Sequence, residues 1–168
     1  GKAALARYGV GAISAPDMRW SRCDVKSISL LPNVLVKEVA RRHGAYEAWM
    51  VGEDTLIREG TSTNIWIVDG DGVLRTHPLS DRILGGITRD VLCALADGLG
   101  LRLEERAFDL EEALSAREAF ISSSTNFVMP VIELDGQQIG DGKPGAVTLK
   151  LCAAYWNYVE QQTGVNHW

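Results

Sequence analysis

Apolar residues recur along the chain with two different spacings, and the spacing changes from one stretch to the next. Short apolar or alternating stretches bounded by Gly, Asp and Pro are typical of β-strands. The strands predicted in this way cover residues 8–15, 20–25, 46–52, 55–58, 63–69, 73–76, 101–107, 118–122 and 127–133. Turn sequences separate two pairs of these strands, namely Gly52-Glu53-Asp54 and Asp69-Gly70-Asp71-Gly72.

Helical spacing, with apolar residues three or four positions apart, marks four other stretches. The predicted helices cover residues 31–42, 88–99, 110–116 and 147–162. Gly44 ends the first helix, Gly98 and Gly100 end the second, and Asp109 is placed to cap the third. Strands interleaved with helices predict an α/β fold.

Composition and charge narrow the class of protein. The 168 residues are enough to enclose one hydrophobic core, and 46% of them are apolar, as in ordinary globular domains. The net charge of −5 disfavours nucleic acid as a partner, because phosphate binding requires a basic surface. No apolar run approaches the length that spans a membrane, and there is no signal-peptide pattern. We therefore expect neither a nucleic-acid partner nor a membrane partner.

The cysteines and histidines predict neither disulfides nor a metal site. Cys23, Cys93 and Cys152 are odd in number and widely spaced, as expected for reduced thiols in a cytoplasmic protein. The three histidines stand far apart, and no spacing typical of metal ligands occurs.

Lys26 stands where a lysine is unusual. It ends the predicted strand 20–25 and precedes the predicted helix 31–42. Burying an unpaired ammonium is costly, so such a lysine either forms an ion pair or loses its proton and becomes a nucleophile. The alternative is a lysine whose stem packs inside while its head reaches water. Arg22 and Asp24 lie on the same face of the predicted strand, where they either order the site or pair with each other at the surface.

Sequence motifs along nearly the whole chain resemble one enzyme family. Arg22-Cys23-Asp24-Val25-Lys26-Ser27 and the helix start after it resemble the cofactor-lysine segment of the class IV aminotransferases, the fold-type IV pyridoxal-phosphate enzymes. The other similar stretches follow in the family's order: Glu59-Gly60-Thr61-Ser62-Thr63-Asn64, Arg75-Thr76-His77-Pro78, Ile83-Leu84-Gly85-Gly86-Ile87-Thr88-Arg89, Ile121-Ser122-Ser123-Ser124-Thr125, Leu134-Asp135-Gly136 and Gly140-Asp141-Gly142-Lys143-Pro144-Gly145. The likeness is closest to the D-amino acid aminotransferases of this family.

The resemblance implies a barrel-like mixed β-sheet flanked by helices. It also implies that residues 1–168 are the C-terminal, cofactor-binding domain of an enzyme whose N-terminal domain is absent from this chain. The implied cofactor is pyridoxal 5'-phosphate. In the family the N-terminal domain closes the pocket. The alternative to an active chain is therefore an inactive C-terminal fragment that needs a separate N-terminal piece of the same protein.

The resemblance also assigns roles around the cofactor ring. Lys26 would supply the amine that bonds to the cofactor and then moves the α-proton of the substrate. Glu59 would pair with the pyridine nitrogen and keep it protonated, so that the ring accepts electrons from the substrate. Without the resemblance, Glu59 is typical of a solvated glutamate at the end of a strand. Leu84 would pack on one face of the ring, and its alternative is plain core packing.

A phosphate site is expected at the start of the predicted helix 88–99. Glycines that precede a helix let an anion approach the N–H groups at its N-terminus. By the resemblance, the amides of Ile87 and Thr88 and the Thr88 hydroxyl would hold the phosphate, with Ser124 as a second contact. The alternatives are that Thr88 is an ordinary N-cap and that Ser124 belongs to a polar turn.

The resemblance implies transfer of an amino group between D-amino acids and 2-oxo acids, by a cytoplasmic homodimer. Two other activities share the scaffold and the lysine. One is that of a branched-chain L-amino acid aminotransferase, and the other is that of an aminodeoxychorismate lyase, which performs an elimination.

Overall fold

The computed structural model describes residues 2–165 of the chain, with side chains from residue 5 onward. Its helices are α1 (Lys2–Tyr8), α2 (Leu31–Arg42), α3 (Ile87–Gly98), α4 (Leu110–Ser115) and α5 (Ala146–Thr163). Its strands are β1 (Val10–Pro16), β2 (Glu47–Val51), β3 (Ile57–Gly60), β4 (Asn64–Val68), β5 (Leu74–Thr76), β6 (Leu103–Glu105), β7 (Glu118–Ser123), β8 (Phe127–Leu134) and β9 (Gln137–Gln138).

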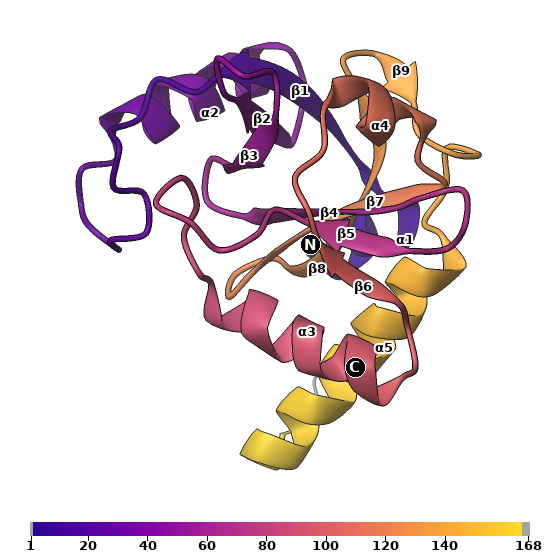
Figure 1. Cartoon of the computed structure of the whole chain (residues 1–168). Coiled ribbons are helices and arrows are strands. Elements are labelled where there is room, and N and C mark those ends of the chain that lie inside the picture. The colour runs from indigo at the N-terminus through magenta and orange to yellow at the C-terminus, as the bar shows by residue number, and fades with distance from the viewer. Residues whose placement is uncertain (1, 166–168) are drawn as a thin grey trace.

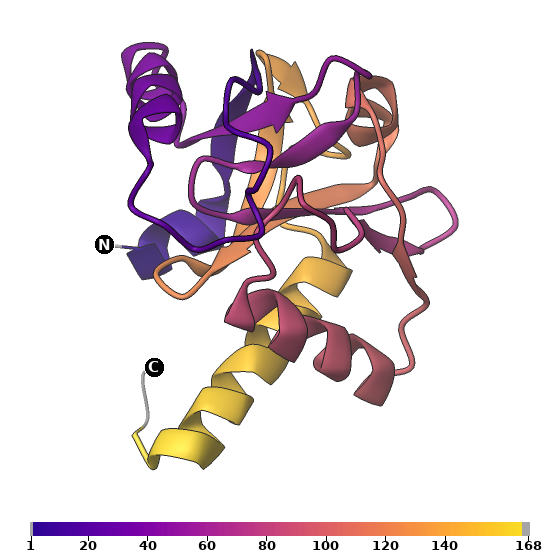
Figure 2. The ribbon, with the colours of Figure 1, turned by 60° about the vertical axis from the view of Figure 1, so that its left-hand side comes forward.

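The strands of this described range belong to one mixed sheet (Figure 1). The order along the sheet is β3-β2-β1-β8-β7-β4-β5-β6, and β9 pairs with β8. β1 runs parallel to β2 and to β8, and β5 runs parallel to β6, whereas the other pairs are antiparallel. The strand direction turns steadily across the sheet (Figures 1 and 2), so the sheet curls into part of a barrel with helices around it. The predicted α/β class and barrel-like mixed sheet are confirmed.

Strand β4 shows why the sheet needs apolar residues on both faces. All five of its residues are buried: Ile65 and Ile67 pack into one core, and Trp66 and Val68 pack into another. Side chains alternate between the faces of a strand, so a continuous apolar run satisfies burial on both sides. Helices α3 and α5 cover the Trp66 face and lie against each other beneath the sheet (Figures 1 and 2).

The strand predicted before Lys26 is wrong. Residues 17–30 instead form a loop that leaves β1 and reaches α2 without regular structure (Figure 2). Trp20 and Val25, the large apolar residues of the prediction, are 49% and 43% exposed. Their burial therefore contributes little to the core, and local sequence alone does not hold an extended segment in a sheet.

Smaller differences concern the ends of elements. Helix α1 was not predicted, and the predicted strand 101–107 is reduced to the three residues of β6. Helix α3 begins at Ile87, one residue before the predicted start. None of the helices in residues 2–165 combines the length and the apolar character needed to cross a membrane.

Candidate active site

A cavity of about 590 Å³ lies between loop 17–30, the turn from β3 to β4 and the start of α3. Its wall includes every residue that the sequence assigned to a cofactor site, namely Lys26, Glu59, Leu84, Ile87, Thr88 and Ser124. These residues come from four separate stretches of the chain. The structure therefore brings the predicted site residues together, while their individual roles stay predictions.

Lys26 reaches this cavity from a loop and not from a buried strand end. The side chain lines the cavity and is exposed, so the expectation of a buried lysine is wrong. The neighbouring Arg22 and Asp24 pair with each other, with Nε–Oδ1 and Nη2–Oδ2 distances of 2.9 and 2.8 Å, and both are exposed. Of the two alternatives for this pair, the structure shows pairing at the surface.

Glu59, at the end of β3, is buried in the cavity wall with 6% of its surface exposed. Its Oε2 accepts hydrogen bonds from the backbone N–H of Leu84 (3.0 Å) and from Nδ2 of Asn64 (3.3 Å), and its Oε1 pairs with Arg19. The alternative of a solvated glutamate is therefore wrong. Burial raises the pKa of Glu59 to about 7, although the Arg19 guanidinium and the hydrogen bond from the backbone N–H of Leu84 act in the opposite direction.

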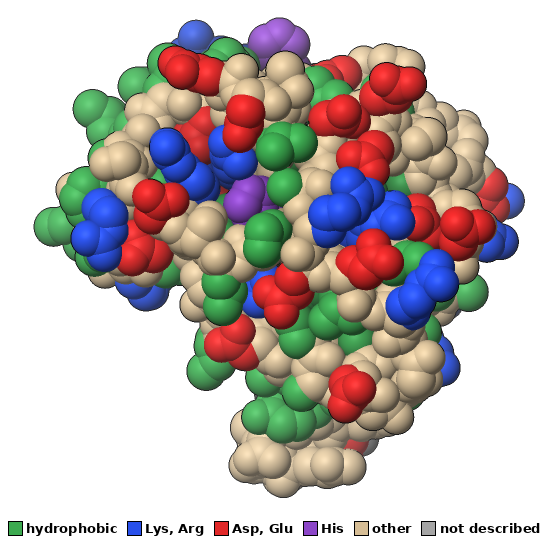
Figure 3. All heavy atoms as spheres, viewed as in Figure 1, with side chains coloured by type: hydrophobic (Ala, Val, Ile, Leu, Met, Phe, Trp, Pro, Cys, Tyr) green, Lys and Arg blue, Asp and Glu red, His purple; other side chains and the backbone are tan. Residues whose placement is uncertain are grey.

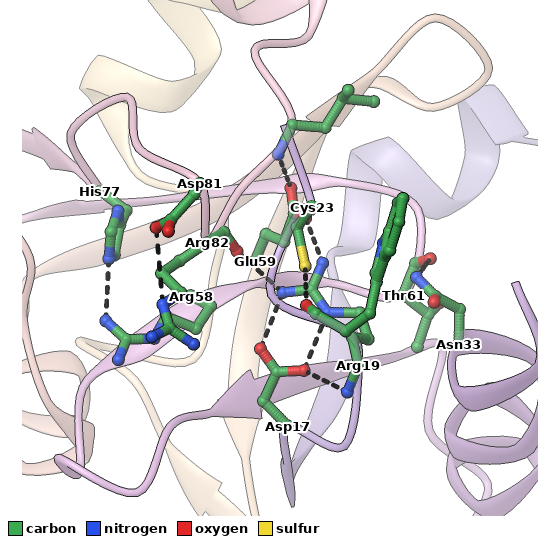
Figure 4. A network of polar contacts seen from close by, with 12 residues as sticks. Asp17, Arg19, Cys23, Asn33, Arg58, Glu59, Thr61, His77, Asp81 and Arg82 are labelled. Atoms are coloured by element: carbon green, nitrogen blue, oxygen red, sulfur yellow. Dashed lines mark hydrogen bonds and ion pairs between the residues drawn. The ribbon is translucent and has the colours of Figure 1, made fainter. Parts of the chain in front are cut away.

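Arg19 is a site residue that the sequence reasoning missed. Figure 4 shows its guanidinium between Asp17 and Glu59. It binds both carboxylate oxygens of Asp17, at 2.9 Å from Nε and 2.8 Å from Nη2, and it also donates to the carbonyl of Arg82 at 3.0 Å. Burial alone would lower the pKa of Arg19, but the two carboxylates raise it. The signal in the sequence was the Asp17–Arg19 spacing, which places two opposite charges on one side of an extended segment.

Helix α3 directs its N-terminus at the cavity without a side-chain cap. The N-cap residue of α3 is Gly86, and no side chain among the described residues forms a capping hydrogen bond at this end of the helix. The alternative that Thr88 is an ordinary N-cap is therefore wrong. A Cβ atom on Gly86 would lie 2.6 Å from Oδ1 of Asn64, and this close approach requires glycine. The first N–H groups of a helix lack partners within the helix, so this end of α3 can bind an anion.

Thr88 lies beside that helix end with a hydroxyl that has no hydrogen-bond partner in the described part of the chain, although the residue is only 2% exposed. A buried hydroxyl without a partner is costly, which indicates that a ligand completes it. Ile87, whose amide is the other predicted phosphate donor, is 74% exposed and lines the cavity. The arrangement suits a compact anion such as a phosphate group.

The serines at the end of β7 differ in their environments. Ser122 is fully buried, and its Oγ accepts a hydrogen bond from Nε1 of Trp66 at 2.8 Å. Ser123 Oγ accepts from the backbone N–H of Asn126 at 3.0 Å, which is the polar-turn geometry given above as the alternative for this stretch. Ser124 is exposed at the cavity wall. Ser124 is thus open to the cavity, and its role as a phosphate contact stays a prediction.

Comparisons with known proteins show the family of this chain. The sequence profile of amino-transferase class IV matches residues 4–134. The chain belongs to the class IV aminotransferases.

Two curated relatives extend this result. A D-alanine aminotransferase of Bacillus licheniformis is 44% identical over 155 residues, and one of Staphylococcus haemolyticus is 39% identical over 155 residues. Each alignment covers 92% of this chain and 54% of the relative. The chain therefore spans about half the length of the curated relatives it matches.

Solved structures of branched-chain aminotransferases share the fold. The enzyme of Thermoproteus uzoniensis, solved with norvaline, has a TM-score of 0.84 and 32% identity, over 95% of this chain and 54% of its own. The enzyme of Thermobaculum terrenum, solved in its PLP form, has a TM-score of 0.86 and 26% identity, over 93% of this chain and 52% of its own.

Proposed function

We propose that the protein containing this chain is a pyridoxal-phosphate-dependent transaminase that moves amino groups between D-amino acids and 2-oxo acids. The observation that carries the proposal is that Lys26, Glu59 and the start of α3 face a single cavity. The D-alanine aminotransferases, which are relatives at 39% and 44% identity, support the choice of D-amino acids.

The residues of the cavity suit the separate parts of this cofactor. The open N-terminus of α3 and the unpartnered hydroxyl of Thr88 suit the phosphate. Glu59, with a pKa of about 7, suits a carboxylate that shares a proton with a pyridine nitrogen. Lys26 brings an amine to the same cavity, and Leu84 offers an apolar side chain.

Each residue then has a defined task. When it is bound, pyridoxal phosphate supplies an electron sink that stabilises negative charge on the α-carbon of the substrate. The amine of Lys26 takes the proton from the α-carbon and returns it. Glu59 holds a proton at the ring nitrogen, while Thr88, the amide of Ile87 and the hydroxyl of Ser124 hold the phosphate.

We further propose that this chain acts as the C-terminal, cofactor-binding half of a cytoplasmic homodimer, together with an N-terminal domain or a separate N-terminal piece. Exposed apolar side chains lie along the edge formed by loop 17–30 and α2 (Figure 3). They include Ile28 (98% exposed), Leu31 (68%), Val34 (60%) and Leu35 (52%). Such a surface supports coverage by another part of the enzyme. The three unpaired cysteines support a reducing compartment.

A second candidate is transamination of branched-chain L-amino acids, because solved enzymes with that name share the fold at TM-scores of 0.84 and 0.86. The test is to titrate the purified protein with pyridoxal phosphate and to supply 2-oxoglutarate with either D-alanine or L-leucine. We expect visible absorbance from the bound cofactor and transfer from D-alanine. Transfer from L-leucine alone would favour the second candidate, and release of pyruvate from aminodeoxychorismate would indicate the lyase. A protein that binds no pyridoxal phosphate would contradict all three activities.

A further inference from the structure

A buried carboxylate that has no part in the proposed chemistry lies behind the turn between β3 and β4. Glu47, on β2, is 0% exposed. The antiparallel register places Trp49 of β2 opposite Gly60 of β3. Glu47 lies two residues earlier on the same face, so it faces the turn that follows Gly60.

The carboxylate of Glu47 joins this turn to two other elements. Its Oε1 accepts hydrogen bonds from Oγ1 of Thr61 (2.5 Å) and from the backbone N–H of the same residue (3.3 Å), while its Oε2 accepts from Oγ1 of Thr63 (3.1 Å). Oε1 also accepts from Nζ of Lys37 on α2 (3.1 Å) and from the backbone N–H of Ala48 on β2 (2.9 Å). One side chain therefore fixes the turn, β2 and α2 relative to one another.

The turn is shaped to receive this carboxylate. A Cβ atom on Gly60 would lie 3.1 Å from Cγ of Glu47 and 2.1 Å from Oγ1 of Thr63, so the glycine leaves room for both side chains. In addition, Nδ2 of Asn33 on α2 donates to the carbonyl of Thr61 at 2.8 Å (Figure 4). Hydrogen bonds with Glu47 of β2 and with Asn33 of α2 thus fix the position of residues 61–63.

The turn carries a residue of the cavity at each end. Glu59 precedes it and Asn64 follows it, and their side chains are hydrogen-bonded to each other at 3.3 Å. We propose that Glu47 is a positioning residue: by holding residues 61–63 it sets the orientation of Glu59 and Asn64 toward the ligand. The inference rests on the proposed function in that the ligand is taken to be pyridoxal phosphate.

The three hydroxyl groups of the turn, on Thr61, Ser62 and Thr63, differ in whether they are already hydrogen-bonded to Glu47. The hydroxyl protons of Thr61 and Thr63 are donated to Glu47, although both residues line the cavity. Ser62, between them, is exposed at the cavity wall. The threonine hydroxyls therefore stabilise the turn through Glu47, and of the three hydroxyl groups that of Ser62 is free to donate to a ligand.

The test compares Glu47→Ala with the conservative Glu47→Gln in the purified protein. Glutamine keeps an amide oxygen where Oε1 lies and an N–H₂ group that can donate to the Thr63 hydroxyl. We expect Glu47→Ala to accelerate backbone hydrogen exchange at residues 60–64 about tenfold or more, since a hydrogen bond to a charged group has that order of effect on an equilibrium constant. Pyridoxal phosphate affinity should fall by a similar factor, and Glu47→Gln should restore most of both properties.

Glu118→Ala provides the matched control. This carboxylate accepts hydrogen bonds from the backbone N–H groups of Val147 (3.0 Å) and Thr148 (2.8 Å) at the start of α5, and it does not line the cavity. Loss of the Glu118 carboxylate should accelerate backbone hydrogen exchange at the start of α5. Hydrogen exchange at residues 60–64 and affinity for pyridoxal phosphate should both stay unchanged. If Glu47→Ala does not fold, Thr61→Val removes one of the bonds with little change of shape and should give the same local pattern.

Two results would overturn the positioning role. One is exchange that rises equally throughout the protein in Glu47→Ala, which would indicate loss of global stability. The other is unchanged affinity for pyridoxal phosphate despite rapid exchange at residues 60–64. Failure of the unmodified protein to bind pyridoxal phosphate would contradict the proposed function, and the exchange comparison would still show whether Glu47 holds the turn.

Discussion

Arg19 and Glu59 form a buried ion pair in the cavity wall, and this pair joins loop 17–30 to strand β3, forty residues further along the chain. Their side chains are 6% and 8% exposed. Asp17 binds the same guanidinium on its other side, so one cation lies between two carboxylates. The pair connects the loop that carries Lys26 to the residue that is proposed to contact the cofactor ring.

Replacing Arg19 by methionine should destabilise the protein strongly. Asp17, whose pKa is lowered by Arg19, stays charged at neutral pH and loses its guanidinium partner in a largely buried position, and breaking a buried pair from one side costs about 3–5 kcal/mol. Denaturant unfolding at neutral pH measures this loss. Arg22→Met is the control, because Arg22 and Asp24 form an exposed pair whose loss should change stability little. Equal effects of the two substitutions would contradict a special role for the buried pair.

Glu59 should make stability depend on pH in a direction unusual for a carboxylate. Its pKa is about 7 in the folded protein against an ordinary value of 4.5, so the folded state holds this proton more tightly. The contribution of protonated Glu59 to the free energy of unfolding is therefore complete below about pH 4.5 and is lost as the pH rises through 7. Relative to Glu59→Gln, the unmodified protein should lose up to about 3 kcal/mol over this range. A stability difference that stays constant with pH would contradict the raised pKa.

Glu59→Gln should also slow catalysis while cofactor binding stays largely intact. Removing the charge lowers the proton affinity of the pyridine nitrogen, and each pKa unit corresponds to about 1.4 kcal/mol. The measurement is the rate of each half-reaction in single-turnover experiments. Rates equal to those of the unmodified protein would show that Glu59 is not the partner of the ring nitrogen.

Lys26→Ala should remove the visible absorbance of the lysine-bound cofactor and lower transamination by orders of magnitude, because no other amine would replace the nucleophile and proton carrier. Lys150→Ala, on the exposed surface of α5, should leave both properties unchanged. Borohydride reduction followed by peptide mapping locates the bond directly. A pyridoxyl label on any lysine other than Lys26 would disprove the assignment.

Thr88→Val should weaken cofactor binding and leave the cofactor-free protein at least as stable as before. Valine keeps the shape of the side chain but removes a hydroxyl that has no partner within the described residues, so folding loses no hydrogen bond. A hydrogen bond to a charged phosphate contributes about 1.5–3 kcal/mol, so affinity should fall by about one to two orders of magnitude. Titration of the cofactor-free protein measures the affinity, and thermal unfolding measures the stability.

Thr148→Val is the matched control for this substitution. Thr148 lies in the first turn of α5, and its hydroxyl donates to Glu118 at 2.8 Å. Its loss should lower stability and leave cofactor affinity unchanged. If Thr88→Val instead lowers stability at constant affinity, the phosphate site lies elsewhere.

The regular elements were predictable wherever periodicity is strong. Residues 65–68 of β4 form a continuous apolar run, and α3 and α5 carry apolar residues at helical spacing, so the central parts of these elements follow from local pattern alone. The motif residues Lys26 and Glu59 were also identified from the sequence, because the resemblance depends on residue types in a fixed order and not on geometry.

The sequence by itself determined the α/β class, the family and the candidate site residues, since each of these depends on local periodicity or on short motifs. Only the tertiary structure decided the environments of those residues. Loop 17–30 has no strong periodicity, and the burial of the Arg19 side chain depends on its contacts with Glu59 of β3 and with the carbonyl of Arg82. Likewise, the hydrogen bonds of Glu47 with Lys37, Thr61 and Thr63 join residues that lie ten to sixteen positions apart. Long-range contacts of this kind arise from packing of the whole sheet, and a local pattern does not record them.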